Sequence, residues 1–184
     1  IFSKDTTRWN IFECEPDAGG TIAYYSFSDT IINLKTYHKI YREFMTSPEQ
    51  TIAGGDVCGY VYEDTINGEY WFLKFTDSEY IEHLFIDLSL NKGDTFILIS
   101  DFRFMWKDSI IVDSVFMNNE KRVVEFNVNQ SNCINNPKLR FVEGVGATNG
   151  FYMGEDFEDP LIYSLVCKYN DDTLFYSTEL NIYG

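Results

Sequence analysis

The sequence is poor in cationic residues. It holds 14 Lys and Arg against 29 Asp and Glu, which gives a net charge of −15 at pH 7. Binding to a phosphate backbone depends largely on cationic side chains that release counterions. Nucleic acid and an anionic membrane surface are therefore not expected as partners. The sequence also lacks a run of about 18 apolar residues, the length that a membrane-spanning helix requires, so no spanning segment is expected.

Cysteine is scarce as well, and its spacing matches no metal motif. The four cysteines, Cys14, Cys58, Cys133 and Cys167, form no CxxC motif and no Cys/His pattern. Such patterns are what a structural zinc site requires, so no zinc site is predicted. Free thiols and disulfides remain alternatives. If one disulfide forms, the predicted pair is Cys133 with Cys167.

Catalytic motifs are also missing. The sequence contains neither GxSxG, which places a nucleophilic serine, nor HExxH, which binds a catalytic zinc. Its two histidines, His38 and His83, lie in predicted strands without a companion Cys or Ser motif and are expected to face outward. Acidic clusters at 155–159 and 171–172 lack the regular spacing of a calcium loop, which favours a solvated surface. We predict no catalytic residue, no metal and no cofactor.

One glycine-rich stretch, FVEGVGATNGFY at 141–152, raises the question of a phosphate-binding loop. A dinucleotide fingerprint requires GxGxxG between a strand and a helix, so that backbone amides meet the pyrophosphate. Gly144 and Gly146 supply the first two glycines, but position 149 is Asn, the next glycine is Gly150, and no amphipathic helix follows. We expect these glycines to provide bends in a strand-rich fold instead.

What the sequence does contain is a recurrent strand pattern. Short segments rich in Tyr, Phe, Ile and Val are closed by Asn, Asp or Gly, which is typical of β-strands. The clearest segments are 20–27, 36–44, 57–63 and 69–75. These segments predict a fold built from strands rather than helices.

Turn residues between β-rich arms predict three hairpins. Asn67-Gly68 separates 57–63 from 69–75 and tolerates the positive φ angles of a tight turn. Asn118-Asn119 lies inside DSIIVDSVFMNNEKRVVEFNV, and Asn170-Asp171 joins LIYSLVCKY to DTLFYST. Successive hairpins of this kind indicate a meander.

The segment 77–90 is ambiguous between a helix and a strand. Its apolar residues include a helical spacing, yet Leu84, Ile86, Leu88 and Leu90 alternate as in a strand, and a strand is favoured. We therefore predict a single all-β domain over residues 1–184, mostly an antiparallel β-meander that closes as a barrel or folds as a sandwich.

The aromatic content is the most functional-looking feature, with 16 Phe, 13 Tyr and 3 Trp. Exposed Tyr and Trp can stack on ligands, because each presents a large apolar area with a polar group at one end. The alternative is packing, since aromatic residues are favoured in strands and stabilise sheets as cross-strand pairs. The candidates for a ligand-binding platform are Trp9, Tyr24, Tyr25, Tyr60, Tyr62 and Trp71.

Five segments occur in the order DTIINLKTYHKIYRE, GYVYEDTINGEYWFL, LFIDLSLNKGDTF, FVEGVGATNGFY and LIYSLVCKYNDDTLFY. Together they resemble a family of exported proteins from gut and oral Bacteroidetes, many of which carry a C-terminal type IX secretion sorting domain. The likeness departs at Asn33-Leu34, where the family usually has Asp-Gly. The resemblance implies an extracellular or outer-membrane surface location and brings no assigned activity. It also marks Glu143, Gly144 and Gly146 as a structural signature, in which we expect Glu143 to bind the backbone amides that the tight glycine path leaves free.

These features together favour a non-catalytic exported or cell-surface domain that contacts glycan or another cell-surface protein through exposed aromatic residues. Two alternatives belong to other classes. One is a structural spacer or scaffold with no ligand. The other is a hydrolase of an extracellular polysaccharide, which would need two carboxyl groups at a separation that sequence does not reveal.

Overall fold

Fourteen strands and no helix make up the residues that the computed structural model describes, namely 2, 6–13, 20–45, 55–75, 79–101, 106–129, 138–150, 163–170 and 173–177. This confirms the predicted all-β class. None of these residues forms a helix that could cross a membrane.

The strands form two antiparallel sheets. The nine-stranded sheet has the order β14-β13-β1-β2-β4-β5-β6-β7, with β3 paired to β4, and the five-stranded sheet has the order β12-β11-β10-β9-β8. The larger sheet comprises β1 (Thr7–Glu13), β2 (Thr21–Ser26), β3 (Asp29–Ile32), β4 (Lys35–Met45), β5 (Asp56–Asp64), β6 (Glu69–Phe75), β7 (Tyr80–Asp87), β13 (Tyr163–Asn170) and β14 (Thr173–Ser177). The smaller comprises β8 (Thr95–Asp101), β9 (Trp106–Asn118), β10 (Lys121–Asn129), β11 (Lys138–Val142) and β12 (Gly146–Ala147).

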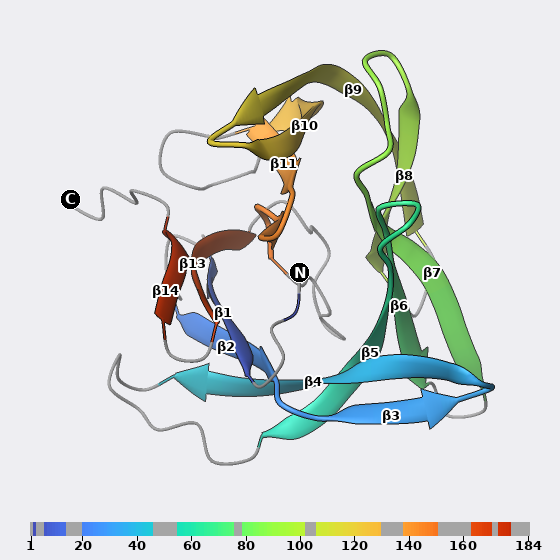
Figure 1. The fold of residues 1–184 in the computed structure, drawn as a ribbon, viewed down its shortest axis with the longest axis vertical. Coiled ribbons are helices and arrows are strands. Elements are labelled where there is room, and N and C mark those ends of the chain that lie inside the picture. The colour runs from blue at the N-terminus through green and yellow to red at the C-terminus, as the bar shows by residue number, and fades with distance from the viewer. Residues whose placement is uncertain are drawn as a thin grey trace.

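The two sheets curl around one interior. Figure 1 looks down this arrangement, with β1, β2, β13 and β14 on the left, β3 and β4 along the bottom, β5–β7 on the right and β9–β11 at the top. Most neighbouring strands are also consecutive in the chain, as a meander requires. Two pairings are exceptions. Strand β2 pairs with β4, with β3 between them in the chain. Strand β1 pairs with β2 on one side and with β13 on the other, so that a late strand returns beside the first.

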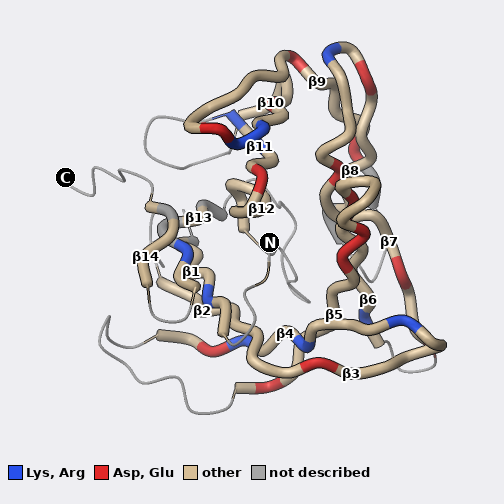
Figure 2. The backbone as a smooth tube through the Cα atoms, viewed as in Figure 1, with Lys and Arg blue, Asp and Glu red and all other residues tan. Residues whose placement is uncertain are grey.

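Both sheets contribute to a single hydrophobic core. Trp9 and Phe72 enter it from the larger sheet, and Phe126 and Phe141 from the smaller one. The Phe126 and Phe141 rings meet edge to face with centroids 4.7 Å apart. Each such side chain contributes about 1.5–3 kcal/mol by leaving water. The acidic residues, by contrast, are spread over strands of both sheets (Figure 2).

All three predicted hairpins are present. The β5–β6 turn spans 65–68, where Gly68 has a φ of 73° and its amide donates to the Asp64 carbonyl at 2.9 Å. The β9–β10 turn lies one residue later than predicted, at Asn119 and Glu120, both with positive φ. Strands β13 and β14 pair directly, and the turn residues 171–172 lie outside the described part of the chain.

Two further local features complete the comparison with the sequence. Within the ambiguous segment 77–90, Tyr80–Asp87 form β7, which confirms the strand prediction for these residues. The short strand β3 and its turn to β4 were missed. This turn uses Asn33 and Leu34 at positive φ values of 49° and 67°.

Candidate functional site

The glycine-rich stretch forms the turn from β11 to β12, and its carbonyl groups point at buried donors. The Val145 amide closes the turn on the Val142 carbonyl at 3.0 Å. The Trp9 indole N–H donates to the Val145 carbonyl at 3.1 Å, and the Lys168 amine donates to the Gly144 carbonyl at 2.5 Å. A phosphate would need amide donors at this place. The turn instead offers carbonyl acceptors, which bind hydrogen-bond donors.

Glu143 does bind a backbone amide, but it is the amide of Arg122 in β10 and not one of the glycine path. Its Oε2 accepts from the Arg122 amide at 2.9 Å, and its own amide donates to the Arg122 carbonyl at 2.9 Å. The carboxylate therefore ties the turn to β10 rather than satisfying the glycine path. Gly144 and Gly146 have φ values of 73° and 118°, a region that favours glycine.

Lys168 is a buried charged residue that the sequence did not single out. Its side chain is fully buried on β13, with the amine 5.5 Å from the Trp9 ring centre and 5.1 Å from that of Phe175. Burial lowers the pKa of this amine to about 7, while the Glu63 carboxylate opposes the shift and Lys121 adds to it. Lys168 thus links β13 to the Gly144 carbonyl at the junction of the two sheets.

Three of the six predicted platform residues are buried, so this part of the prediction is wrong. The exposed fractions of Trp9, Tyr24 and Tyr25 are 1%, 4% and 2%. Trp9 and Tyr24 are direct cross-strand partners on the core face of β1 and β2. Tyr25 faces the other way but is covered, because its ring stacks against Phe27 and Tyr41 at centroid distances of 5.9 and 5.5 Å.

The other three residues lie together on one face of the larger sheet. Tyr62 pairs directly with Trp71, and Tyr60 lies two residues away on the same side of β5. Phe75 and Tyr80 extend this row, with ring centres 4.8 Å apart, and they are 56% and 50% exposed. We call these five residues the aromatic face. It lies opposite the core, because the alternating residues of β5 and β6 point inward.

Charged side chains border the aromatic face. The Trp71 indole N–H donates to the Glu69 carboxylate at 3.0 Å. Glu82 accepts from the Tyr37 hydroxyl at 2.5 Å and from the Lys35 amine at 3.2 Å, which brings β7 against the start of β4, as Figure 1 shows at the lower right. Burial, helped by Glu82, raises the pKa of Tyr37 above its ordinary value. Tyr37 therefore remains a neutral donor.

A pocket of about 660 Å³ adjoins the aromatic face where β4, β5 and β6 meet, and we call it the bulge pocket. The register between β4 and β5 shifts here, which leaves Cys58 as the extra residue of a β-bulge. Such bulges redirect side chains and are common beside functional sites. The lining residues are Arg42, Glu43, Phe44, Gly55, Asp56, Val57, Cys58, Gly59, Tyr60, Lys74 and Phe75.

Tyr60 and Phe75 belong to both the aromatic face and the bulge pocket. Burial raises the pKa of Tyr60, and the neighbouring phenols of Tyr80 and Tyr41 raise it further. The remaining walls combine two cations with two carboxylates, so the pocket has mixed polarity. The Cys58 thiol donates to the Ile40 carbonyl at 3.4 Å. The predicted Cys133–Cys167 disulfide lies outside the residues whose side chains are described.

The histidines differ from their predicted outward positions. His83 is buried against the Phe72 ring, and burial lowers its pKa to about 4, so the outward prediction is wrong for it. His38 is half-buried, with its Nδ1 2.7 Å from an Asp29 oxygen and its ring stacked on Phe2. The described residues contain no group of three metal-ligating side chains. The acidic clusters at 155–159 and 171–172 lie outside the described residues.

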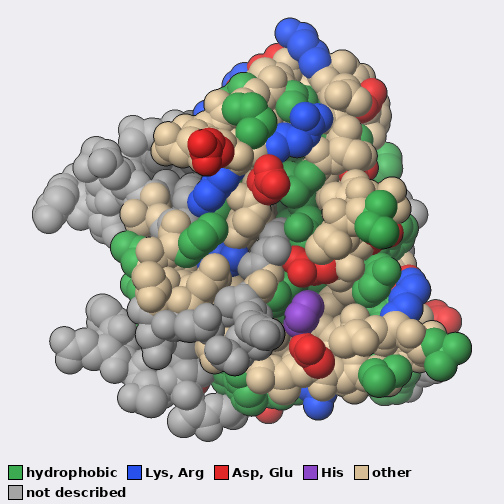
Figure 3. Space-filling view, in the orientation of Figure 1, with side chains coloured by type: hydrophobic (Ala, Val, Ile, Leu, Met, Phe, Trp, Pro, Cys, Tyr) green, Lys and Arg blue, Asp and Glu red, His purple; other side chains and the backbone are tan. Residues whose placement is uncertain are grey.

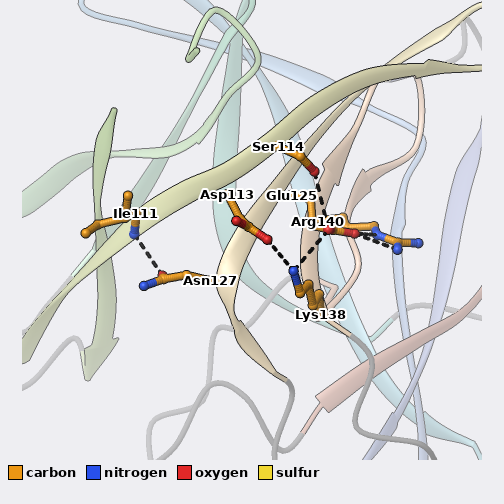
Figure 4. Close-up of polar contacts among 7 residues, drawn as sticks. All are labelled: Ile111, Asp113, Ser114, Glu125, Asn127, Lys138 and Arg140. Carbon is orange, nitrogen blue, oxygen red and sulfur yellow. Dashed lines mark hydrogen bonds and ion pairs between the residues drawn. The ribbon is translucent and has the colours of Figure 1, made fainter. Parts of the chain in front are cut away.

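A charged network crosses β9, β10 and β11 (Figure 4). Lys138 bridges Asp113 and Glu125, and Arg140 contacts Glu125 at 2.6 Å, while the Ser114 hydroxyl donates to the same carboxylate. Burial alone would raise the pKa of Glu125, but Arg140 and Lys138 outweigh it and the pKa falls. The two carboxylates and the two cationic side chains balance in charge. We interpret the network as one that fixes the register of the three strands.

No family model, curated protein or solved structure matches this chain. The resemblance to exported Bacteroidetes proteins therefore rests on the five sequence segments alone and stays a prediction. The candidate functional site is consequently assigned by its geometry: the aromatic face with its charged border, and the bulge pocket that opens beside it.

Proposed function

We propose that this protein is a non-catalytic, exported or cell-surface module that binds a neutral carbohydrate chain along the aromatic face and in the bulge pocket. The observation that carries the proposal is the position of Tyr60 and Phe75, which join the partly exposed row of rings to a pocket of about 660 Å³. Neither the row of rings nor the polar pocket would by itself indicate one class of ligand. Their continuity favours a chain with flat apolar faces and many hydroxyl groups.

The charges support a neutral glycan over an acidic one. Four carboxylates lie on or beside the site, those of Glu43, Asp56, Glu69 and Glu82, and the whole chain carries a net charge of −15. This field repels polyanions. Carboxylates, amines and phenols can all exchange hydrogen bonds with sugar hydroxyls.

The exposed surface also favours a carbohydrate over a protein partner. On the side shown in Figure 3, hydrophobic side chains are distributed in small groups among polar ones. The fully buried centre of a protein interface is usually depleted of charge. The aromatic face instead is bordered by the carboxylates of Glu69 and Glu82. An aromatic surface bordered by charged hydrogen-bonding groups matches a hydroxylated ligand better.

Binding to a panel of neutral and acidic polysaccharides, measured by isothermal titration calorimetry, tests the proposal. Tyr60→Ala and Phe75→Ala should each weaken binding of the neutral ligand about thirtyfold, because central aromatic contacts contribute about 2 kcal/mol or more. Phe116→Ala is the matched control, since Phe116 is 39% exposed on the other sheet. Equal affinity in all three variants, or no binding by the unmodified protein, would refute the proposal.

Two further measurements address the alternatives. Release of reducing ends from a bound polysaccharide would instead support the hydrolase. Antibody labelling of intact cells tests the proposed location at the cell surface, which rests on the family resemblance.

A further inference from the structure

A second pocket lies at the junction between the two sheets, away from the aromatic face. It has a volume of about 560 Å³, and we call it the seam pocket. The β5–β6 turn, the end of β7, β10 and the glycine-rich turn after β11 each contribute to its wall. The polar side chains that line it are Thr65, Asn67, Tyr70, Ser89, Arg122 and Glu143.

Hydrogen bonds between the contributing segments hold this pocket in shape. The Leu88 amide donates to the Gly68 carbonyl at 2.9 Å, which fixes the β5–β6 turn to the end of β7. Arg122 donates from Nε to the Leu88 carbonyl at 2.7 Å and from Nη2 to the Leu90 carbonyl at 2.9 Å. The Arg122 amide in turn binds Glu143. The walls are therefore preformed, which lowers the entropic cost of binding a ligand.

Tyr70 is the residue that points to a ligand. Its side chain is only 6% exposed, with the ring in the core and the residue in the wall of the pocket. No group among the described residues exchanges a hydrogen bond with its hydroxyl. Burial, together with the Glu63 and Glu143 carboxylates, raises its pKa, so the hydroxyl keeps its proton. Because the hydroxyl itself is not fully buried, it is open to the pocket as a donor that a bound molecule can use.

The remaining groups define the chemistry of that molecule. The Glu143 carboxylate and the Ser89 hydroxyl oxygen, whose hydrogen is donated to Asp87, accept hydrogen bonds, whereas Thr65 and the Asn67 amide can both donate and accept. The charges of Arg122 and Glu143 cancel, so the pocket favours neither an anion nor a cation. Several short polar groups of both kinds around a small volume match a compact neutral molecule with many hydroxyl groups.

We propose that the seam pocket is a second binding site, which takes a single sugar ring or a polyol and hydrogen-bonds it to Tyr70 and Glu143. The site does not depend on the aromatic face, and its ligand can be a free monosaccharide or the terminal ring of a longer chain. Because Tyr70 belongs to the larger sheet and Glu143 follows the last long strand of the smaller one, the bound ring joins the two sheets.

The test measures binding of neutral monosaccharides and polyols by calorimetry and by thermal stability, because a ligand of the folded state raises the melting temperature. Tyr70→Phe should leave the ligand-free melting temperature unchanged, since no protein hydrogen bond is lost, and should weaken binding about tenfold through loss of one hydrogen bond. Tyr37→Phe is the matched control, because that buried phenol already donates to Glu82 on the opposite face. It should bind the ligand as the unmodified protein does.

Phe75→Ala separates this site from the aromatic face. It should weaken binding of the carbohydrate chain about thirtyfold while leaving binding of the single ring intact, so the two proposals fail independently. A chain whose terminal ring is chemically blocked distinguishes the two sources of the ligand. If the seam pocket takes a chain end, blocking should remove binding of the chain at this pocket, whereas binding of a free monosaccharide does not depend on the chain. Absence of binding by every monosaccharide and polyol, or full affinity in Tyr70→Phe, would overturn the seam-pocket proposal.

Discussion

Lys168 should make the stability of this protein rise with pH. Its amine is buried beside Trp9 and Phe175, and burial lowers its pKa from the ordinary 10.5 to about 7. Between these two values the unfolded chain binds more protons than the folded protein. The free energy of unfolding therefore increases from pH 7 towards pH 10.5, because the cost of burying an ammonium group disappears as the folded amine becomes neutral.

The free energy of unfolding should increase by about 2 kcal/mol between pH 7 and pH 9. Each pH unit in this range adds up to about 1.36 kcal/mol, and the total is smaller than twice this value because the folded amine is still partly protonated near pH 7. Urea denaturation at pH 7, 8 and 9 measures it. Lys168→Met keeps an unbranched apolar side chain without the titrating amine, so this increase should be absent. The raised pKa values of Tyr37 and Tyr70 affect stability only above about pH 10, where unfolded phenols begin to ionise.

The comparison uses slopes and not absolute stabilities, because Lys168→Met also leaves the Gly144 carbonyl without its donor. Lys92→Met is the matched control, since Lys92 is exposed and its variant should keep the slope of the unmodified protein. Identical slopes for Lys168→Met and the unmodified protein would show that the buried amine does not carry the pH dependence.

Two other predictions concern stability. His83 is buried with its pKa lowered from 6.5 to about 4, so acid should reduce the free energy of unfolding by about 2 kcal/mol between pH 7 and pH 4.5, and His83→Gln should lose less over the same range in urea denaturation. Leu34 is 99% exposed at a φ of 67°, so Leu34→Gly should raise the free energy of unfolding by about 1 kcal/mol, and a lower melting temperature would contradict this explanation.

The strands and hairpins were predictable because their signals are local. Asn67-Gly68 lies between two alternating segments, and turn chemistry of this kind acts over a few residues. The missed hairpin at Asn33 and Leu34 shows the limit of that signal, since an exposed Leu in a left-handed conformation is an unfavourable turn residue. A turn held by its flanking strands can tolerate such a residue.

The candidate site was only partly predictable, because alternation separates the two faces of a strand without telling which one meets the core. Tyr24 and Tyr62 occur in similar aromatic strands, yet the first points into the core and the second lies on the aromatic face. The pairing of Glu125 with Lys138 depends on strand register, and the burial of Lys168 depends on strands distant in the chain. Neither feature can be predicted from the neighbouring residues in the sequence.

The position of β1 between β2 and β13 has a consequence for how the chain folds. Thr7 pairs with Ser26 on one side and with Asn170 on the other, so one of its two ladders waits for almost the whole chain to be synthesised. Contacts at such separation slow folding. Until residues 163–170 arrive, β1 remains an open edge able to pair with another copy. The order of the strands therefore requires that this edge be kept from pairing with other chains while the protein is being synthesised.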